Sequence, residues 1–106
     1  MPKKILAVGF DPDAELQGVE VNFMSKEEIA KCDLSSFDKV AYRHQNIEGV
    51  AGPDENLAAL IKKLPRDVEL IVYCNKPCDD FGLIAGRGIK TSMANMPATL
   101  AQAINK

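Results

Sequence analysis

Cys74 is the residue of this 106-residue chain that is best suited to chemistry. It ends a strongly apolar run that begins at Val68, and a loop separates it from the next expected helix. A thiol in this position can lie over backbone amides that stabilise a thiolate, which is the nucleophilic form of cysteine. The alternative role is that of a small hydrophobic residue in the core. Cys74 is therefore the catalytic candidate.

Cys78 follows four residues after Cys74 and could act as its resolving thiol. The two could also supply two ligands to a metal ion, but a Cys-x3-Cys pair without a second pair is a weak metal signal. We therefore predict no metal and no cofactor. With Cys32 the chain has three cysteines, an odd number that argues against a disulfide framework, so we expect thiols.

The only histidine, His44, stands beside Arg43 at the end of another apolar run. Such a histidine could serve as an acid, a base or an anion contact near neutral pH, and the alternative is a solvated loop residue. Asn46, Asn75 and Lys76 add hydrogen-bonding groups to the same two strand ends. We therefore include these side chains among the predicted binding residues.

Asp11 and Asp13 follow the first apolar run and could hold a cation. An Asp-Pro-Asp sequence is also typical of a turn or a helix cap, and without a third carboxylate we favour the turn. Asp11 remains a predicted binding residue because it lies at a strand end.

The elements that must position these residues alternate along the chain. Apolar runs of strand length alternate with segments of helical pattern that carry caps, first-turn prolines and apolar faces. The expected strands are 3–10, 19–24 at an edge, 38–43, 68–74 and 89–93; the expected helices begin at Lys26, at Pro53 and at Pro97. This alternation predicts a three-layer α/β/α sandwich with a mostly parallel five-stranded sheet, flavodoxin-like or rhodanese-like.

Ligands of open parallel sheets bind outside the carboxyl ends of the strands. The predicted strands end at Asp11, at Arg43 and His44, and at Cys74, so these residues should meet at one edge of the sheet. The sequence therefore predicts a single site region there.

Composition limits the class of protein. The length fits one domain over residues 1–106, and 46% hydrophobic with 26% charged residues is ordinary globular usage. The net charge of −2 without a basic run argues against a nucleic-acid partner. Apolar runs are too short for a membrane span and no export signal is evident, so we expect a cytoplasmic protein. A second copy of the chain could cover apolar helix faces as a homo-oligomer.

From Met24 onward the chain resembles a rhodanese homology domain. Met24–Ile29 resembles the opening helix of that family, Leu64–Cys74 resembles the approach to its catalytic cysteine, and Gly88–Lys90 with Met93 falls near its closing strand. The resemblance covers about three quarters of the chain. It implies that Cys74 is a sulfur carrier that attacks a donor as a thiolate and holds a persulfide over the amides of its loop.

Two functions follow as hypotheses. The first is a rhodanese-like or degenerate thiol domain with at best a sulfurtransferase-like activity on Cys74. The alternative is a non-catalytic domain that binds a small anion or a protein partner through the same strand ends.

Overall fold

Five parallel strands form one sheet at the centre of the protein. The structure is a computed structural model that describes residues 4–10, 21–31, 33–75, 78–88 and 90–105. The strands are β1 (Ile5–Val8), β2 (Asn22–Met24), β3 (Lys39–Arg43), β4 (Glu69–Tyr73) and β5 (Thr91–Ala94), in the order β2-β1-β3-β4-β5. All four pairings are parallel, which confirms the predicted sheet and gives it the strand order of flavodoxin-like folds.

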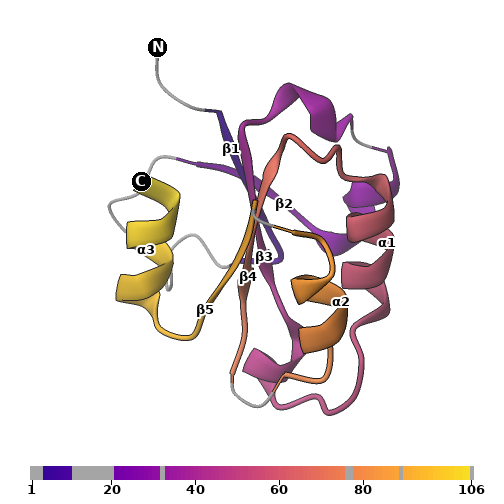
Figure 1. Ribbon diagram of the computed structural model, residues 1–106, viewed down its shortest axis with the longest axis vertical. Helices are drawn as coiled ribbons and strands as arrows, with labels where there is room; N and C mark the ends of the chain where they lie inside the picture. Colours follow the sequence, from indigo (N-terminus) through magenta and orange to yellow (C-terminus); the bar gives the residue numbers. More distant parts are fainter. Residues whose placement is uncertain (1–3, 11–20, 32, 76–77, 89, 106) are drawn as a thin grey trace.

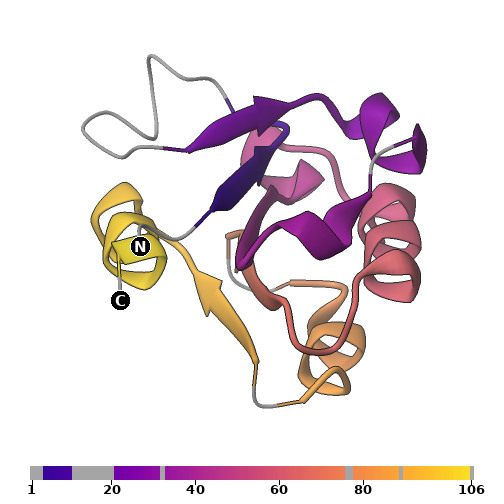
Figure 2. The same ribbon diagram turned by 90° about the horizontal axis from the view of Figure 1, so that it is seen from above.

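Helices cover both faces of the sheet (Figure 1). Helices α1 (Glu55–Lys63) and α2 (Phe81–Ala85) lie together on one face, and α3 (Pro97–Asn105) lies on the other; Figure 2 shows the same separation from above. The predicted three-layer sandwich is therefore confirmed. Within the described residues, no helix is both long enough and apolar enough to cross a bilayer.

Alternation along the central strands divides the core into two halves. Val40 and Tyr42 of β3 face α1 and α2, whereas Ala41 faces α3. Leu70 and Val72 of β4 repeat the pattern on the α1 side. Both faces of these strands are buried, so their sequences are continuous apolar runs and do not alternate between apolar and polar residues.

One predicted helix starts as expected but is of another type, and a second starts later than expected. The helix expected at Lys26 is a 3-10 helix, η1 (Lys26–Lys31), and further 3-10 helices cover Leu34–Ser36 (η2) and Gln45–Glu48 (η3). Pro53 was expected in the first turn of α1 but precedes the helix, because Asp54 is its N-cap and accepts hydrogen bonds from two amides of the first turn. Only the last three residues of the expected edge strand 19–24 form β2, and residues 19 and 20 lie outside the described residues.

A buried lysine joins β3 to the end of α3. Lys39 is 2% exposed, and its ammonium donates hydrogen bonds to the carbonyls of Ala103 and Ile104 at 2.8 and 3.2 Å. The last carbonyls of a helix carry partial negative charge, so a cation stabilises them. Lys39 therefore fixes the helix that forms the third layer.

Candidate functional site

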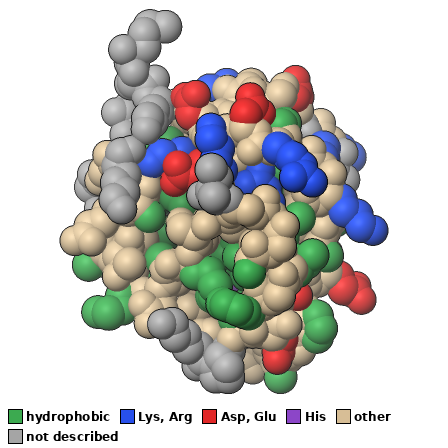
Figure 3. Space-filling model, in the orientation of Figure 1, with side chains coloured by type: hydrophobic (Ala, Val, Ile, Leu, Met, Phe, Trp, Pro, Cys, Tyr) green, Lys and Arg blue, Asp and Glu red, His purple; other side chains and the backbone are tan. Residues whose placement is uncertain are grey.

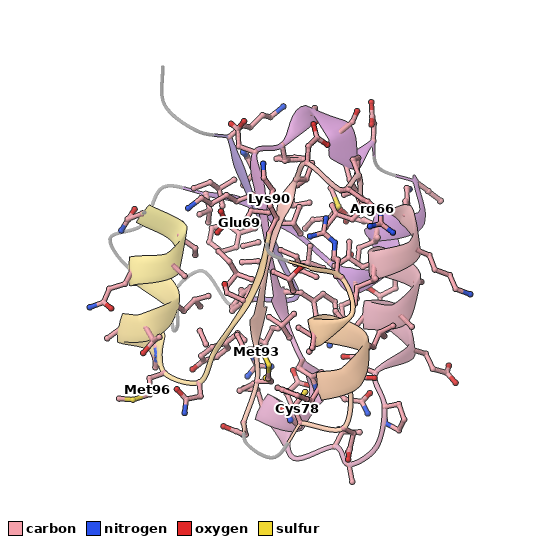
Figure 4. The ribbon with its side chains drawn as sticks, viewed as in Figure 1. Arg66, Glu69, Cys78, Lys90, Met93 and Met96 are labelled. Carbon is pink, nitrogen blue, oxygen red and sulfur yellow. The ribbon has the colours of Figure 1, made fainter. Side chains whose placement is uncertain are left out.

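The carboxyl ends of β3 and β4 bring most of the predicted site residues to one end of the sheet. Arg43 ends β3 and His44 and Asn46 follow it, whereas Cys74 and Asn75 follow β4. Cys78 comes from the loop before α2. Figure 4 shows it at the same end as Met93, and both side chains pack against the core below α1 and α2. Asp11, Asp13 and Lys76 lie outside the described residues.

His44 is completely buried, so the alternative of a solvated loop histidine is wrong. Its Nε2 lies 2.6 Å from an Asp80 carboxylate oxygen, and its Nδ1 accepts a hydrogen bond from the amide of Asn46 at 3.1 Å. A nitrogen that accepts a hydrogen bond carries no proton, so the proton lies on Nε2 and is donated to Asp80. Both ring nitrogens of His44 are thus bonded within the protein.

Asp54 is the most heavily bonded carboxylate of this region and is 1% exposed. One oxygen accepts from the Tyr42 hydroxyl at 2.8 Å and from the amides of Asn56 and Leu57. The other accepts from the Gln45 amide at 3.0 Å and lies 3.5 Å from the ammonium of Lys26. This carboxylate therefore joins the start of α1 to the end of β3 and the start of η1.

Burial alone would raise the pKa of Asp54, but its bonds hold that pKa below the usual value. The Tyr42 hydroxyl contributes most to this lowering, followed by the Gln45 amide and the charge of Lys26. For Tyr42 the effect is the reverse, because burial and the neighbouring Asp54 both raise its pKa. Asp54 is consequently an anion, and Tyr42 is a neutral donor.

Asp80 adds a second carboxylate to the same network. Its Oδ2 accepts from the Asp54 amide at 2.8 Å as well as from His44, and Asp80 is 6% exposed. The adjacent Asp79 accepts from the amide of Gly52 at 3.0 Å. The loop before α2 is therefore bonded to the loop that leads from β3 to α1.

Asn46 and Asn75 bind each other across the ends of the two strands. The Asn46 side chain accepts from the Asn75 amide and donates to the Asn75 carbonyl, both at 2.9 Å. The Asn75 side chain also donates to the Asn46 carbonyl at 3.2 Å. These polar groups therefore close the end of the sheet.

Cys74 lies in the core with 1% of its surface exposed. In the β3–β4 register Arg43 lies opposite Tyr73, so His44 and Cys74 are neighbours one residue further along the two chains. Asp80 binds the imidazole of His44. Cysteine, histidine and aspartate in this order are the residue types of a nucleophile, its base and an orienting acid. Here, however, neither imidazole nitrogen is left for the thiol.

The amide of the residue after Cys74 is also engaged. Asn75 donates its amide to Asn46, so that amide does not stabilise a thiolate or a persulfide. Within the described residues no group of three or more His, Cys, Asp or Glu side chains is placed to hold a metal ion. Core packing is therefore the role of Cys74 that its surroundings favour.

A groove of about 470 Å³ lies beside this network at the end of β1. We call it the switch-point groove, because β1 stands where the connections of the sheet diverge toward β2 and β3. It is lined by the ends of β1 and β2, the start of η1 and one residue of η3: Gly9, Phe10, Phe23, Met24, Ser25, Lys26, Glu27, Glu28 and Glu48.

Lys26 is folded inward across one wall of this groove. Its alkyl chain passes so close to Gly9 that a Cβ there would lie 2.9 Å from Lys26 Cε, and Gly9 has a φ of +79°. The ammonium lies over the Tyr42 ring at 4.9 Å and near Asp54. The positive charge of Lys26 is therefore directed at the buried network and is largely neutralised there.

The groove keeps an acidic and aromatic lining. Glu27 and Glu28 are exposed, and Glu48 is exposed although it pairs with Arg43 at 2.5 Å. Phe23 leaves 41% of its surface in solvent. The sequence signals of strand ends located the region. Phe23, Glu27 and Glu28 were missed because they belong to the edge strand and to η1, where only amphipathic alternation and a helix start could be recognised, and Glu48 was missed because it lies in a segment expected to be a loop.

Comparison with protein-family models, with curated proteins and with solved structures finds no match to this chain. The rhodanese-like resemblance stays a prediction that depends on the residues quoted for it.

We predict that Asp54→Asn lowers the free energy of unfolding by about 3 kcal/mol at pH 7, because the amide group of asparagine would face the Gln45 and Lys26 donors. A carboxylate with a lowered folded pKa stabilises the protein above the unfolded value of about 4, and this contribution is lost as the pH falls further. Urea unfolding from pH 7 to pH 3 should therefore show the difference from wild type shrinking below about pH 4. Asp67→Asn, at an exposed position, is the control; a difference that does not vary with pH would contradict the assignment.

We also predict that native Cys74 reacts with N-ethylmaleimide at least about tenfold more slowly than Cys78, because a buried thiol reacts only during local opening. Mass spectrometry with fragment sequencing separates the two sites, and urea should make their rates similar. Faster reaction at Cys74, or a persulfide on Cys74 after treatment with thiosulfate, would instead favour the sulfur-carrier hypothesis.

Proposed function

We propose that this protein is a non-catalytic binding domain that holds a basic, partly apolar segment of a partner protein in the switch-point groove. The observation that carries the proposal is the acidic and aromatic lining of a groove at the carboxyl ends of β1 and β2. Grooves in this position are the usual ligand sites of open parallel sheets.

The surroundings of the catalytic candidates support binding rather than catalysis. His44 has both nitrogens bonded internally, and Cys74 is 1% exposed. A general base must reach the proton it removes, and a thiolate nucleophile must reach its substrate. In this proposal His44 and Cys74 have a structural role, which is to hold the loops around the groove in place.

The charges of the lining favour a cationic group over the small anion of the sequence hypothesis. Glu27, Glu28 and Glu48 contribute three carboxylates, and Lys26, the only lysine among the described residues of the lining, is directed at Asp54. Like charges would repel an anion at this distance, whereas a guanidinium or ammonium gains charge complementarity. Arg43 neutralises part of the charge of Glu48, so Glu27 and Glu28 supply most of the negative charge of the groove.

The apolar part of the lining favours a side chain of a protein over a free metal cation. Phe23 leaves 41% of its surface exposed among the lining residues, whereas Phe10, two residues after β1, is buried against Tyr73. An arginine side chain can stack its planar group and its alkyl stem on aromatic rings. Aromatic residues beside charges are also typical of protein interfaces.

A cytoplasmic location completes the proposal. Cys74 and Cys78 are thiols in the structure, which suits a reducing compartment.

The test uses two capped dipeptides, arginine–phenylalanine and glutamate–phenylalanine, titrated into ¹⁵N-labelled protein. The arginine peptide should shift the amide signals of Gly9, Phe23 and Ser25, and the glutamate peptide should shift them far less. The double variant Glu27→Gln and Glu28→Gln, which removes two charges of the lining, should lower the affinity for the arginine peptide by about threefold or more. Glu55→Gln, at the start of α1 and outside the groove, is the matched control. Equal shifts from both peptides would contradict the proposal.

A further inference from the structure

A second groove, of about 570 Å³, lies between α1 and α2 on the face opposite α3. Figures 1 and 2 both show these two helices side by side. We call it the helix groove; its walls come from the end of α1, the segment that follows it, and α2. None of the described residues lines both this groove and the switch-point groove.

One glycine keeps the α2 wall open. Gly82 lies within α2, whereas Gly86 is the C-cap of this helix and a Cβ there would lie 3.2 Å from the Gly82 carbonyl oxygen. A Cβ built at Gly82 meets nothing within 4 Å, so the missing side chain leaves space that no other group fills.

Apolar side chains are exposed along the same groove. Leu83 leaves 41% of its surface in solvent and lies next to Gly82 on α2. Ile61 and Pro65 line the opposite side and are partly buried. A partner with one or two apolar side chains could therefore bury them between the helices.

The charged residues of the lining are all basic. Lys62 and Arg66 are exposed, and neither makes an ion pair within the described part of the chain. Figure 3 shows lysine and arginine side chains on the upper part of the molecule, with acidic side chains among them, and Figure 4 places Arg66 near the upper end of α1. No described acidic residue is among those that line the groove.

A third cation is fixed in the wall by backbone carbonyls. Arg87 donates to the carbonyls of Pro65 and Val68, both at 2.7 Å. It also donates to the Lys90 carbonyl and to the Thr91 hydroxyl, both at 3.1 Å. Burial and the nearby charge of Arg66 lower its pKa, as expected of two cations that lack an anion between them. Because both terminal nitrogens of the Arg87 guanidinium donate hydrogen bonds within the protein, Arg87 contributes a fixed positive charge to the wall and does not offer these two nitrogens to a phosphate.

We infer that the helix groove is a docking site for an acidic, amphipathic segment of a partner protein. Carboxylates of that segment would meet Lys62 and Arg66, and an apolar side chain would lie beside Leu83 in the space left by Gly82. The charge of this groove is opposite to that of the switch-point groove, so the two surfaces fit different segments and the inference does not depend on the proposed function.

Other anionic partners fit the groove less well. A nucleic acid would need a run of cations along its phosphates, whereas this groove has three cations around an apolar wall. The whole chain also carries a net charge of −2. Charge and apolar surface together fit an acidic amphipathic peptide.

The test selects binders from a displayed library of random peptides of about 15 residues, a length that can form a helix on binding. Peptides selected on the full chain should be enriched in aspartate and glutamate with one or two large apolar residues. A synthesised peptide from the selection should shift the amide signals of Gly82, Leu83 and Gly86, and its affinity should fall as the salt concentration rises.

Three variants make the test specific. Arg66→Glu should lower the affinity for the selected peptide by about tenfold or more. Gly82→Leu fills the groove with a residue that suits a helix better than glycine, so it should abolish binding without lowering the melting temperature. Lys31→Glu, the same charge change in η1, should leave the affinity within about twofold of wild type.

Several results would overturn the inference. They are selected peptides without acidic enrichment, binding that Arg66→Glu and Gly82→Leu leave unchanged, or signal shifts outside the groove. Tighter binding of a single-stranded oligonucleotide or of anionic lipid vesicles at the same residues would assign the groove to another class of partner. Self-association in sedimentation that Arg66→Glu removes would assign it to a second copy of the chain.

Discussion

The buried carboxylate of Asp54 is the interaction on which the site end of this protein depends. It caps α1, receives the Tyr42 hydroxyl from the central strand and neutralises Lys26 from the start of η1. Its own amide binds Asp80, which holds His44. An unbonded carboxylate in such a buried place would be costly, so each of these donors stabilises the whole arrangement. Removing one of these groups would leave other polar groups buried without a hydrogen-bond partner, which makes the network cooperative.

This network changes the meaning of the residues that first suggested catalysis. Cysteine, histidine and aspartate meet at the ends of β3 and β4, as they do in nucleophilic active sites, but here the imidazole bonds to Asp80 and to an amide. Cys74 packs in the core beside them. Polar chemistry at a strand end can therefore serve to close loops over a parallel sheet, and the grooves beside it become the surfaces where partners can bind.

The fold could be predicted from the sequence because parallel strands that are buried on both faces are written as continuous apolar runs, such as the one that ends at Tyr73. The helix start at Asp54 was nearly predictable from the capping preference of aspartate. The burial of His44 was not, because it depends on Asp80, which is distant in sequence and returns to β3 only in the folded chain. Gly82 gave no signal, since the open space beside it exists only when α2 packs next to α1.

The most direct test of this account is the protonation of the His44 ring, which long-range ¹H–¹⁵N NMR spectra can resolve at neutral pH. The account predicts a proton on Nε2, shared with Asp80, and an Nδ1 that carries no proton and accepts from the Asn46 amide. Asp80→Asn should disturb the signals of this ring. A proton on Nδ1 in the native protein would contradict the account, because the ring would then not close the network as described.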